Sequence, residues 1–270
     1  MTRRAIRWLA VIAATTCIVL SRPAAAQDVA VDLELVLAVD VSGSMDTQER
    51  LLQRDGYVQA FLHPEVIAAI RAGINGRIAV AYVEWAGPRS QNMVMPWRLI
   101  DGQEAAAAVS AELALAESPR IRGTSISGAL AFSSALFDGN GFASGRKAID
   151  VSGDGPNNMG PPVVPMRDTV VARGITINGL PLTLRPGGSF GLPAGLLAIY
   201  YEDCVIGGPG AFFISVQAPE QLADAIRRKL VLEIAGREPE VVPAQLTQSP
   251  PRIDCLIGEK TRPMWLDENR

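Results

Sequence analysis

The fold of this chain is decided by the stretch Leu33–Val39, LELVLAV, and by the residues that follow it directly, Asp40-Val41-Ser42-Gly43-Ser44. The run is apolar except for Glu34 and does not alternate, which is typical of a parallel strand buried on both faces of a sheet. The acid and the two serines then stand in a loop at the carboxyl end of that strand. This pattern predicts an open, mostly parallel α/β sheet.

The rest of the chain alternates between strand-like and helical segments. Strands are predicted at 77–85, 91–100, 146–152, 174–180 and 211–216, and helices at 47–70 with a break at Pro64, 101–117, 126–137, 163–173 and 219–235. We expect 91–100 at a sheet edge because Pro96 cannot donate to a ladder, and Asp101 as the cap of the next helix. The Gly- and Pro-rich residues 181–209 are expected to be irregular. The alternation predicts one doubly wound, mostly parallel sheet with helices on both faces over 27–235.

The first 26 residues read as a secretory signal peptide. Arg3, Arg4 and Arg7 precede the uncharged run Trp8–Leu20, and Ala24–Ala26 offers a cleavage site. That run is too short to span a bilayer, and no later segment reaches eighteen apolar residues, so no membrane span is expected in the mature chain. The protein is therefore expected to be exported, to the periplasm or to the outside. The arginine pair leaves general secretory and twin-arginine export both open.

Composition excludes several classes of function. The 270 residues are 48% hydrophobic and 20% charged, as in globular proteins, with 25 basic and 28 acidic residues and one histidine. Without the signal peptide 21 basic residues remain, which makes the net charge −7. The sequence has no block of basic residues, which argues against nucleic-acid binding. A zinc site built on several histidines is excluded, and a Ser-His-Asp triad would have to use His63, which precedes the helix break at Pro64.

Two cysteines, Cys204 and Cys255, lie beyond the signal peptide. Export would place them in an oxidising compartment, where a single intramolecular disulfide is the default and two free thiols are the alternative. Residues 236–270, which contain five prolines, would then form a tail stapled to the domain.

Three loops at the carboxyl ends of strands hold oxygen-bearing side chains, and such ends meet at one edge of a parallel sheet. They contain Asp40, Ser42 and Ser44, then Thr124, then Asp154. In an extended loop the first three can point the same way. Two carboxylates and three hydroxyls form the hard donor set that Mg²⁺ prefers, with Mn²⁺ or Ca²⁺ as alternatives. Taken singly, Thr124 fits a helix N-cap and Asp154 a turn.

These motifs resemble those of von Willebrand factor A domains. Val39–Met45 looks like the opening motif of that family's metal-ion-dependent adhesion site, Gly123–Ile126 is similar to its threonine element, and Asp154-Gly155 resembles its aspartate element. The resemblance covers about Leu33 to Ala235 and implies the same doubly wound fold. The chain departs from the pattern at Gly153, where the family usually has an apolar residue or threonine.

The resemblance also implies roles for the candidate residues. Ser42, Ser44 and Thr124 would approach the metal, with Asp40 and Asp154 close by, often through water. Outside the motifs, Tyr201–Gly210 and the later cysteine look like a set of exported bacterial proteins that carry an A-type domain of unassigned function. The resemblance therefore implies a fold and a metal site, and leaves the biological role open.

The function predicted from these features is an exported, metal-dependent protein-binding module, not an enzyme. A partner would present an acidic side chain to the metal, and the net charge of −7 makes recognition local to the ion. The alternatives are a magnesium-dependent hydrolase or phosphoryl-transfer enzyme, and a structural envelope protein with a vestigial site. The sequence contains neither a P-loop nor a D-x-D pair, which disfavours the enzymes.

Overall fold

The computed structural model describes residues 28–116, 121–185, 195–236 and 252–261. The signal peptide predicted at 1–26 lies outside these residues, as do 186–194 of the expected insert and parts of the expected tail. Within the described ranges, no helix combines the length and the apolar character needed to cross a membrane.

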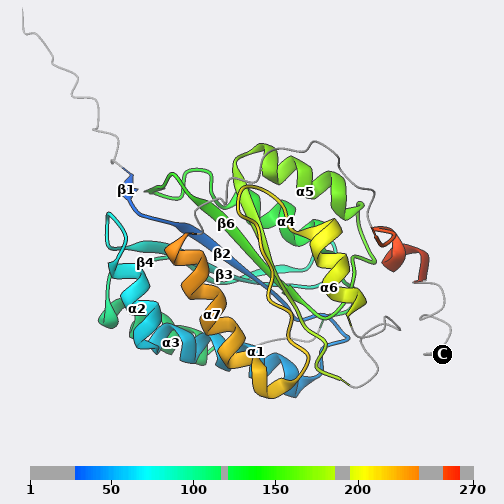
Figure 1. Cartoon of the computed structure of the whole chain (residues 1–270), viewed down its shortest axis with the longest axis horizontal. Coiled ribbons are helices and arrows are strands. Elements are labelled where there is room, and N and C mark those ends of the chain that lie inside the picture. Colours follow the sequence, from blue (N-terminus) through cyan, green and yellow to red (C-terminus); the bar gives the residue numbers. More distant parts are fainter. Residues whose placement is uncertain (1–27, 117–120, 186–194, 237–251, 262–270) are drawn as a thin grey trace, which may run out of the picture.

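The centre of the molecule is a five-stranded sheet with the strand order β4-β3-β2-β6-β7 (Figure 1). Its strands are β2 (Glu34–Asp40), β3 (Ile78–Trp85), β4 (Gln91–Ile100), β6 (Lys147–Gly153) and β7 (Ile175–Pro181). β4, the strand with Pro96, lies at the sheet edge, as predicted. It pairs with β3 in antiparallel direction, and all other neighbouring strands are parallel. A two-residue pairing of β1 (Val29–Ala30) with β5 (Phe142–Ala143) stands apart.

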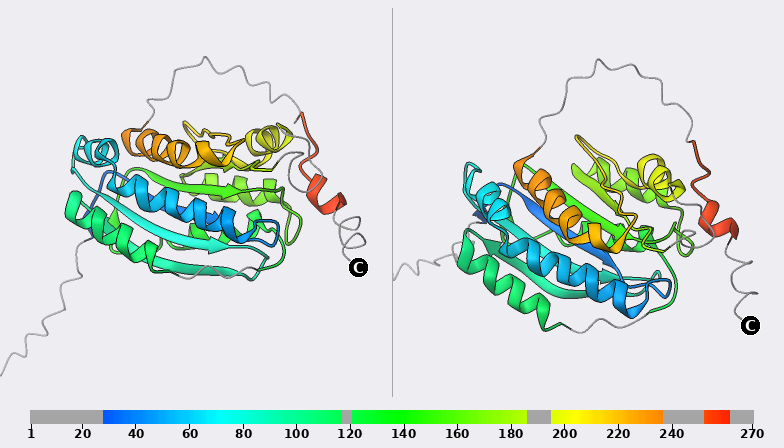
Figure 2. Two further views of the ribbon diagram at one scale, coloured as in Figure 1. Left: turned by 90° about the horizontal axis from the view of Figure 1, so that it is seen from below. Right: turned by 60° about the horizontal axis from the view of Figure 1, so that its bottom comes forward.

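The helices cover both faces of this sheet (Figures 1 and 2). One core cluster joins the sheet to α1 (Thr47–Leu62), α2 (Pro64–Arg71), α3 (Gln103–Ala114) and α7 (Leu222–Ala235), which follows the 3₁₀ turn η2 (Pro219–Gln221). The other cluster contains α4 (Ile126–Ala135), α5 (Val163–Ala172), α6 (Leu196–Tyr200) and the π-helical turn η1 (Tyr201–Val205). The predicted doubly wound α/β fold is confirmed.

The strand predictions succeeded where burial is two-sided. Every residue of β2 and β3 is buried, which is why the run after Asp32 shows no alternation. In register, Asp40 lies beside Trp85 of β3, and Val39 lies beside Ser152 of β6. The loop after β2 therefore starts next to the loop after β6, which begins at Asp154.

Three local predictions were wrong. Asp101 does not cap α3, because the helix begins one residue later and Gly102 is its N-cap. Residues 211–216 form no strand but two isolated bridges, Phe213 with Gly179 of β7 and Val216 with Leu182 just after it. Asn178 Oδ1 takes the N–H of Phe212, and Pro181, between the two bridges, has no N–H to donate. The expected irregular insert contains α6 and η1, because the apolar run from Leu196 packs into the core.

A disulfide joins Cys204 in η1 to Cys255, with 5.6 Å between their Cα atoms. It ties residues 252–261, which end in a short helical turn at 257–261, to the α6 end of the molecule (Figures 1 and 2). The pairing spans 51 residues of sequence, so it closes a long loop of the chain.

Candidate metal centre

The loop after β2 is folded by its own side chains. The N–H of Ser42 donates to Asp40 Oδ1 at 2.7 Å, and the hydroxyls of Ser42 and Ser44 are 2.8 Å apart. The N–H of Met45 donates to the carbonyl of Ser42, which closes a turn just before α1 begins. Asp40, Ser42 and Ser44 are therefore held together on one short turn.

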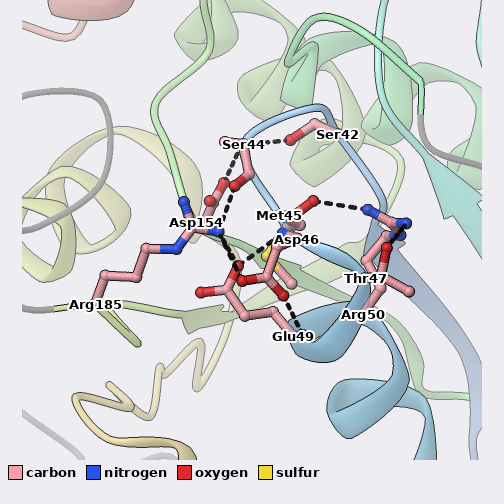
Figure 3. A network of polar contacts seen from close by, with 9 residues as sticks. All are labelled: Ser42, Ser44, Met45, Asp46, Thr47, Glu49, Arg50, Asp154 and Arg185. Atoms are coloured by element: carbon pink, nitrogen blue, oxygen red, sulfur yellow. Dashed lines mark hydrogen bonds and ion pairs between the residues drawn. The ribbon is translucent and has the colours of Figure 1, made fainter.

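The loop after β6 meets this turn (Figure 3). Ser44 donates its hydroxyl to Asp154 Oδ1 at 2.6 Å, although 110 residues separate the two. Arg185, beyond the end of β7, donates to the carbonyl of Ser44 at 2.8 Å and pairs with Glu49 in the first turn of α1. The first and third of the predicted motifs are thus adjacent, and an arginine stands at their rim.

Thr124 reaches the same region through backbone contacts on both sides. Ile121 bridges to Ser42 in the loop after β2. The N–H of Thr124 donates to Asn158 Oδ1 at 3.0 Å, and its carbonyl accepts from the N–H groups of Asn158 and Met159. The segment with Thr124 is therefore clamped between the two other loops.

Thr124 does not cap the helix that follows it. Ser125 is the N-cap of α4, and its hydroxyl accepts from the N–H of Gly128. Thr124 Oγ1 is fully buried and has no hydrogen-bond partner among the described residues. A capping role for this threonine is excluded, and an uncommitted buried hydroxyl remains.

The electrostatics of the site favour a cation. Asp40 is fully buried, and its Oδ2 also has no hydrogen-bond partner in the described part of the chain. Burial and the negative charge of Asp154 raise the pKa of Asp40 well above its usual value. A cation between the two acids would offset both effects, and two carboxylates with three hydroxyls suit a hard ion such as Mg²⁺. The residues present fit the predicted metal.

Other kinds of metal site find no support in the described residues. No group of three or more His, Cys, Asp or Glu residues gathers there in a way that could hold a metal. His63 accepts from the N–H of Glu65 as the N-cap of α2, at the far end of α1 from Asp46. The 16 residues of α1 put it about 24 Å away along the helix axis.

Sequence reasoning missed the residues that brace the loop after β6. Asn157 accepts from the N–H of Ser127 through Oδ1, and its own N–H donates to the hydroxyl of Tyr200 in α6. Its Nδ2 donates to Glu259 Oε1, in the segment tied by the disulfide, at 2.7 Å. The Asn157-Asn158 pair was visible only as a turn signal, which says nothing of these distant partners.

The chain matches the model of one protein family. A family model described as "Protein of unknown function (DUF1194)" matches residues 30–238. The chain belongs to this family. No curated protein matches the sequence.

Several solved structures share the fold of this DUF1194 member. The von Willebrand factor domain of the type V pili tip protein Mfa5 from Porphyromonas gingivalis is 13% identical, with 78% of this chain and 98% of that one covered and a TM-score of 0.53. The pilus adhesin SpaC from Lactobacillus rhamnosus GG is 13% identical at a TM-score of 0.55, over 77% of this chain and 31% of that one.

A third structure is proximal thread matrix protein 1 from the mussel byssus with a zinc-occupied MIDAS motif, where MIDAS denotes the metal-ion-dependent adhesion site. It is 15% identical over 78% of this chain and 49% of that one, with a TM-score of 0.53. The chain thus spans about half of the mussel protein and about a third of the pilus adhesin. At these identities the comparisons establish the fold, and they confirm that it is von Willebrand factor A-like.

Proposed function

We propose that this protein is an exported binding module that holds one divalent cation, Mg²⁺ first and Mn²⁺ or Ca²⁺ as alternatives. The hydroxyls of Ser42, Ser44 and Thr124 would hold the ion, with Asp40 and Asp154 close by. The observation that carries the proposal is the pair of buried atoms without partners, Thr124 Oγ1 and Asp40 Oδ2, in a site built from three separate loops. Buried polar atoms without partners are costly and call for a ligand.

The bound ion would supply a local positive charge with exchangeable positions. Three of the five proposed protein groups are neutral hydroxyls, so the ion keeps charge available for an outside ligand. A carboxylate from a protein partner fits this demand, because it is a hard, anionic oxygen ligand. The rim residue Arg185 adds a second positive group near the site, although it is already paired with Glu49.

Two further features support a binding module outside the cytoplasm. The structural neighbours are a pilus adhesin, a pilus tip domain and a byssus matrix protein, and none of these names describes an enzyme. Residues 1–26 have the pattern of a signal peptide, and the disulfide suits an oxidising compartment. The mature protein would then comprise the domain at 27–235 and a stapled tail at 236–270.

The proposal is tested by removing one hydroxyl. We expect Thr124→Val, which keeps the shape of the side chain, to weaken Mg²⁺ and Mn²⁺ binding at least about tenfold in calorimetric titration, since the loss of even an indirect metal partner costs that much. Asp40→Asn should abolish measurable binding. Thr176→Val, near the start of β7 and thus at the other end of the sheet, is the matched control and should bind like wild type. Equal binding by Thr124→Val and wild type would contradict the site.

The same variants test the carboxylate mechanism. Wild-type protein should capture its partner from the envelope of the exporting cell in Mg²⁺ and lose it in excess chelator. Thr124→Val should fail in both conditions, and Thr176→Val should behave as wild type. Undiminished capture in chelator rejects a partner that binds through the metal, even if the protein does bind Mg²⁺.

A further inference from the structure

Tyr201, the first residue of the π-helical turn η1, lies in the core next to the metal centre. Its side chain is fully buried, and its hydroxyl has no hydrogen-bond partner among the described residues. A buried hydroxyl without a partner costs free energy in the folded state. π-helical turns are also frequent at functional sites.

Two glycines in neighbouring strands make room for this side chain. A Cβ atom at Gly179 of β7 would lie 2.7 Å from Tyr201 Cδ1, closer than van der Waals contact allows. A Cβ atom at Gly153 of β6 would lie 2.9 Å from the Tyr201 hydroxyl and also 2.9 Å from Asp40 Oδ2. The hydroxyl and the carboxylate oxygen therefore face the same small space beside Gly153.

The two atoms in that space are chemically complementary. Asp40 Oδ1 already accepts from the N–H of Ser42, which leaves Oδ2 as the free acceptor. A tyrosine hydroxyl ordinarily titrates near pH 10, so it carries its proton at neutral pH. The hydroxyl thus stays protonated and can donate.

We infer that Tyr201 is a positioning residue of the metal centre, whose hydroxyl holds Asp40 Oδ2 through one bridging water once the ion is bound and so fixes this carboxylate for the ion. The inference rests on the proposed function. Carboxylates at metal sites are commonly held by such outer partners, which set their orientation. A donor also gains strength when its acceptor is ionised, as Asp40 would be beside a cation.

The test is Tyr201→Phe, which removes only the hydroxyl. We expect Mg²⁺ and Mn²⁺ affinity to fall roughly tenfold. In chelator, the midpoint of urea unfolding should stay the same or rise, because a buried hydroxyl without a partner is lost. A merely structural tyrosine would lower the stability and leave the affinity alone. Tyr82→Phe, in β3 and equally buried on the other face of the sheet, is the control and should bind metal like wild type.

A double-mutant cycle tests whether Tyr201 and Asp40 act through one shared contact. Gly153→Ala puts a methyl group into the shared space and should weaken metal binding by displacing Asp40 Oδ2 or the tyrosine hydroxyl. In the Gly153→Ala background, Tyr201→Phe should cost less affinity than it does alone, since the contact is already broken. Additive losses would mean that the two residues act separately, and they would overturn the inference.

The outcomes separate this inference from the proposed function. If wild type binds metal, Asp40→Asn does not, and Tyr201→Phe binds like wild type, the metal centre stands and the role of Tyr201 is rejected. If wild type binds no divalent ion, both are rejected.

Discussion

Two places in this molecule bury a pair of carboxylates, and they differ in where the positive charge comes from. Asp150 of β6 and Glu233 of α7 share the ammonium group of Lys229, with Nζ at 2.8 Å from one and 2.5 Å from the other. Four residues further along the chain from Asp150, Asp154 interacts with Asp40 at the proposed metal centre. Among the described residues, no lysine or arginine forms an ion pair with Asp40. The first pair holds its cation within the chain, and in the proposed function the second pair holds a cation from solution.

The residues around the two pairs of carboxylates also differ. Asn178 donates to Glu233 at 2.9 Å, and the ring of Phe212 lies 5.0 Å from Lys229 Nζ, so the internal cation is enclosed by the fold. At the metal centre, Thr124 Oγ1 is buried and uncommitted. Buried acids alone therefore do not mark a binding site, and the informative feature is that Thr124 Oγ1 and Asp40 Oδ2 are buried without hydrogen-bond partners among the described residues.

The largest expected effect comes from removing the internal cation. Lys229→Met should lower the free energy of unfolding by about 3–5 kcal/mol, the usual cost of leaving a buried charge without its partner. Metal affinity of the folded protein should not change. Urea unfolding and Mn²⁺ titration measure the two quantities. Arg228→Met, the exposed neighbour on α7, should cost no more than about 0.5 kcal/mol. A Lys229→Met variant as stable as wild type would contradict this prediction, because the two buried acids would then not depend on the lysine.

The next effect concerns the disulfide, which lies at the metal end of the molecule. Replacing Cys204 and Cys255 with alanine should cost roughly 2–4 kcal/mol of stability, because a link across 51 residues restrains the unfolded chain. The Lys229 cluster should be unaffected. Metal affinity should fall a few-fold, since Glu259 would no longer be held against Asn157 in the loop of Asp154.

A single variant separates the link from the contact. Glu259→Ala keeps the disulfide and should lower metal affinity with little loss of stability. Non-reducing peptide mapping of the native protein should find the two cysteines joined. If both thiols can be alkylated, the tail is not stapled and this prediction fails.

The sequence alone predicted the sheet and the three motif loops, because each of them depends on a short continuous stretch of residues. The two-sided burial of β2 leaves an unbroken apolar run, and a parallel sheet then brings Asp40 and Asp154 to one edge. The place of Tyr201 could not be predicted, since it depends on the space left by Gly153 and Gly179 on two other strands.

The buried cluster was missed for a related reason. The helix after Pro219 shows an apolar stripe of Leu222, Ile226 and Leu230, and Lys229 looks like an ordinary solvent-facing residue beside it. Lys229 is buried because it pairs with Asp150 in the sheet. The two residues are far apart in the sequence, so no local sequence pattern could predict this contact.

The smallest expected effect is a pH dependence that belongs to the internal cluster alone. Burial and the negative charge of Glu233 raise the pKa of Asp150 to about 7, although the charge of Lys229 opposes this. In the unfolded chain an aspartate titrates near 4. Between these values the folded state binds more protons than the unfolded state, so the contribution of Asp150 to stability is largest in acid and falls as the pH rises.

Asp150→Asn removes this titration while it keeps the size of the side chain. In excess chelator, the free energy of unfolding of the variant relative to wild type should therefore shift in its favour by roughly 1–3 kcal/mol between pH 5 and pH 8. Asp168→Asn, an exposed aspartate of α5, should show no such shift. A constant difference across this range would mean that Lys229 fully neutralises Asp150 in the fold. The internal pair would then be better compensated than we infer, and its contrast with the metal centre would be sharper still.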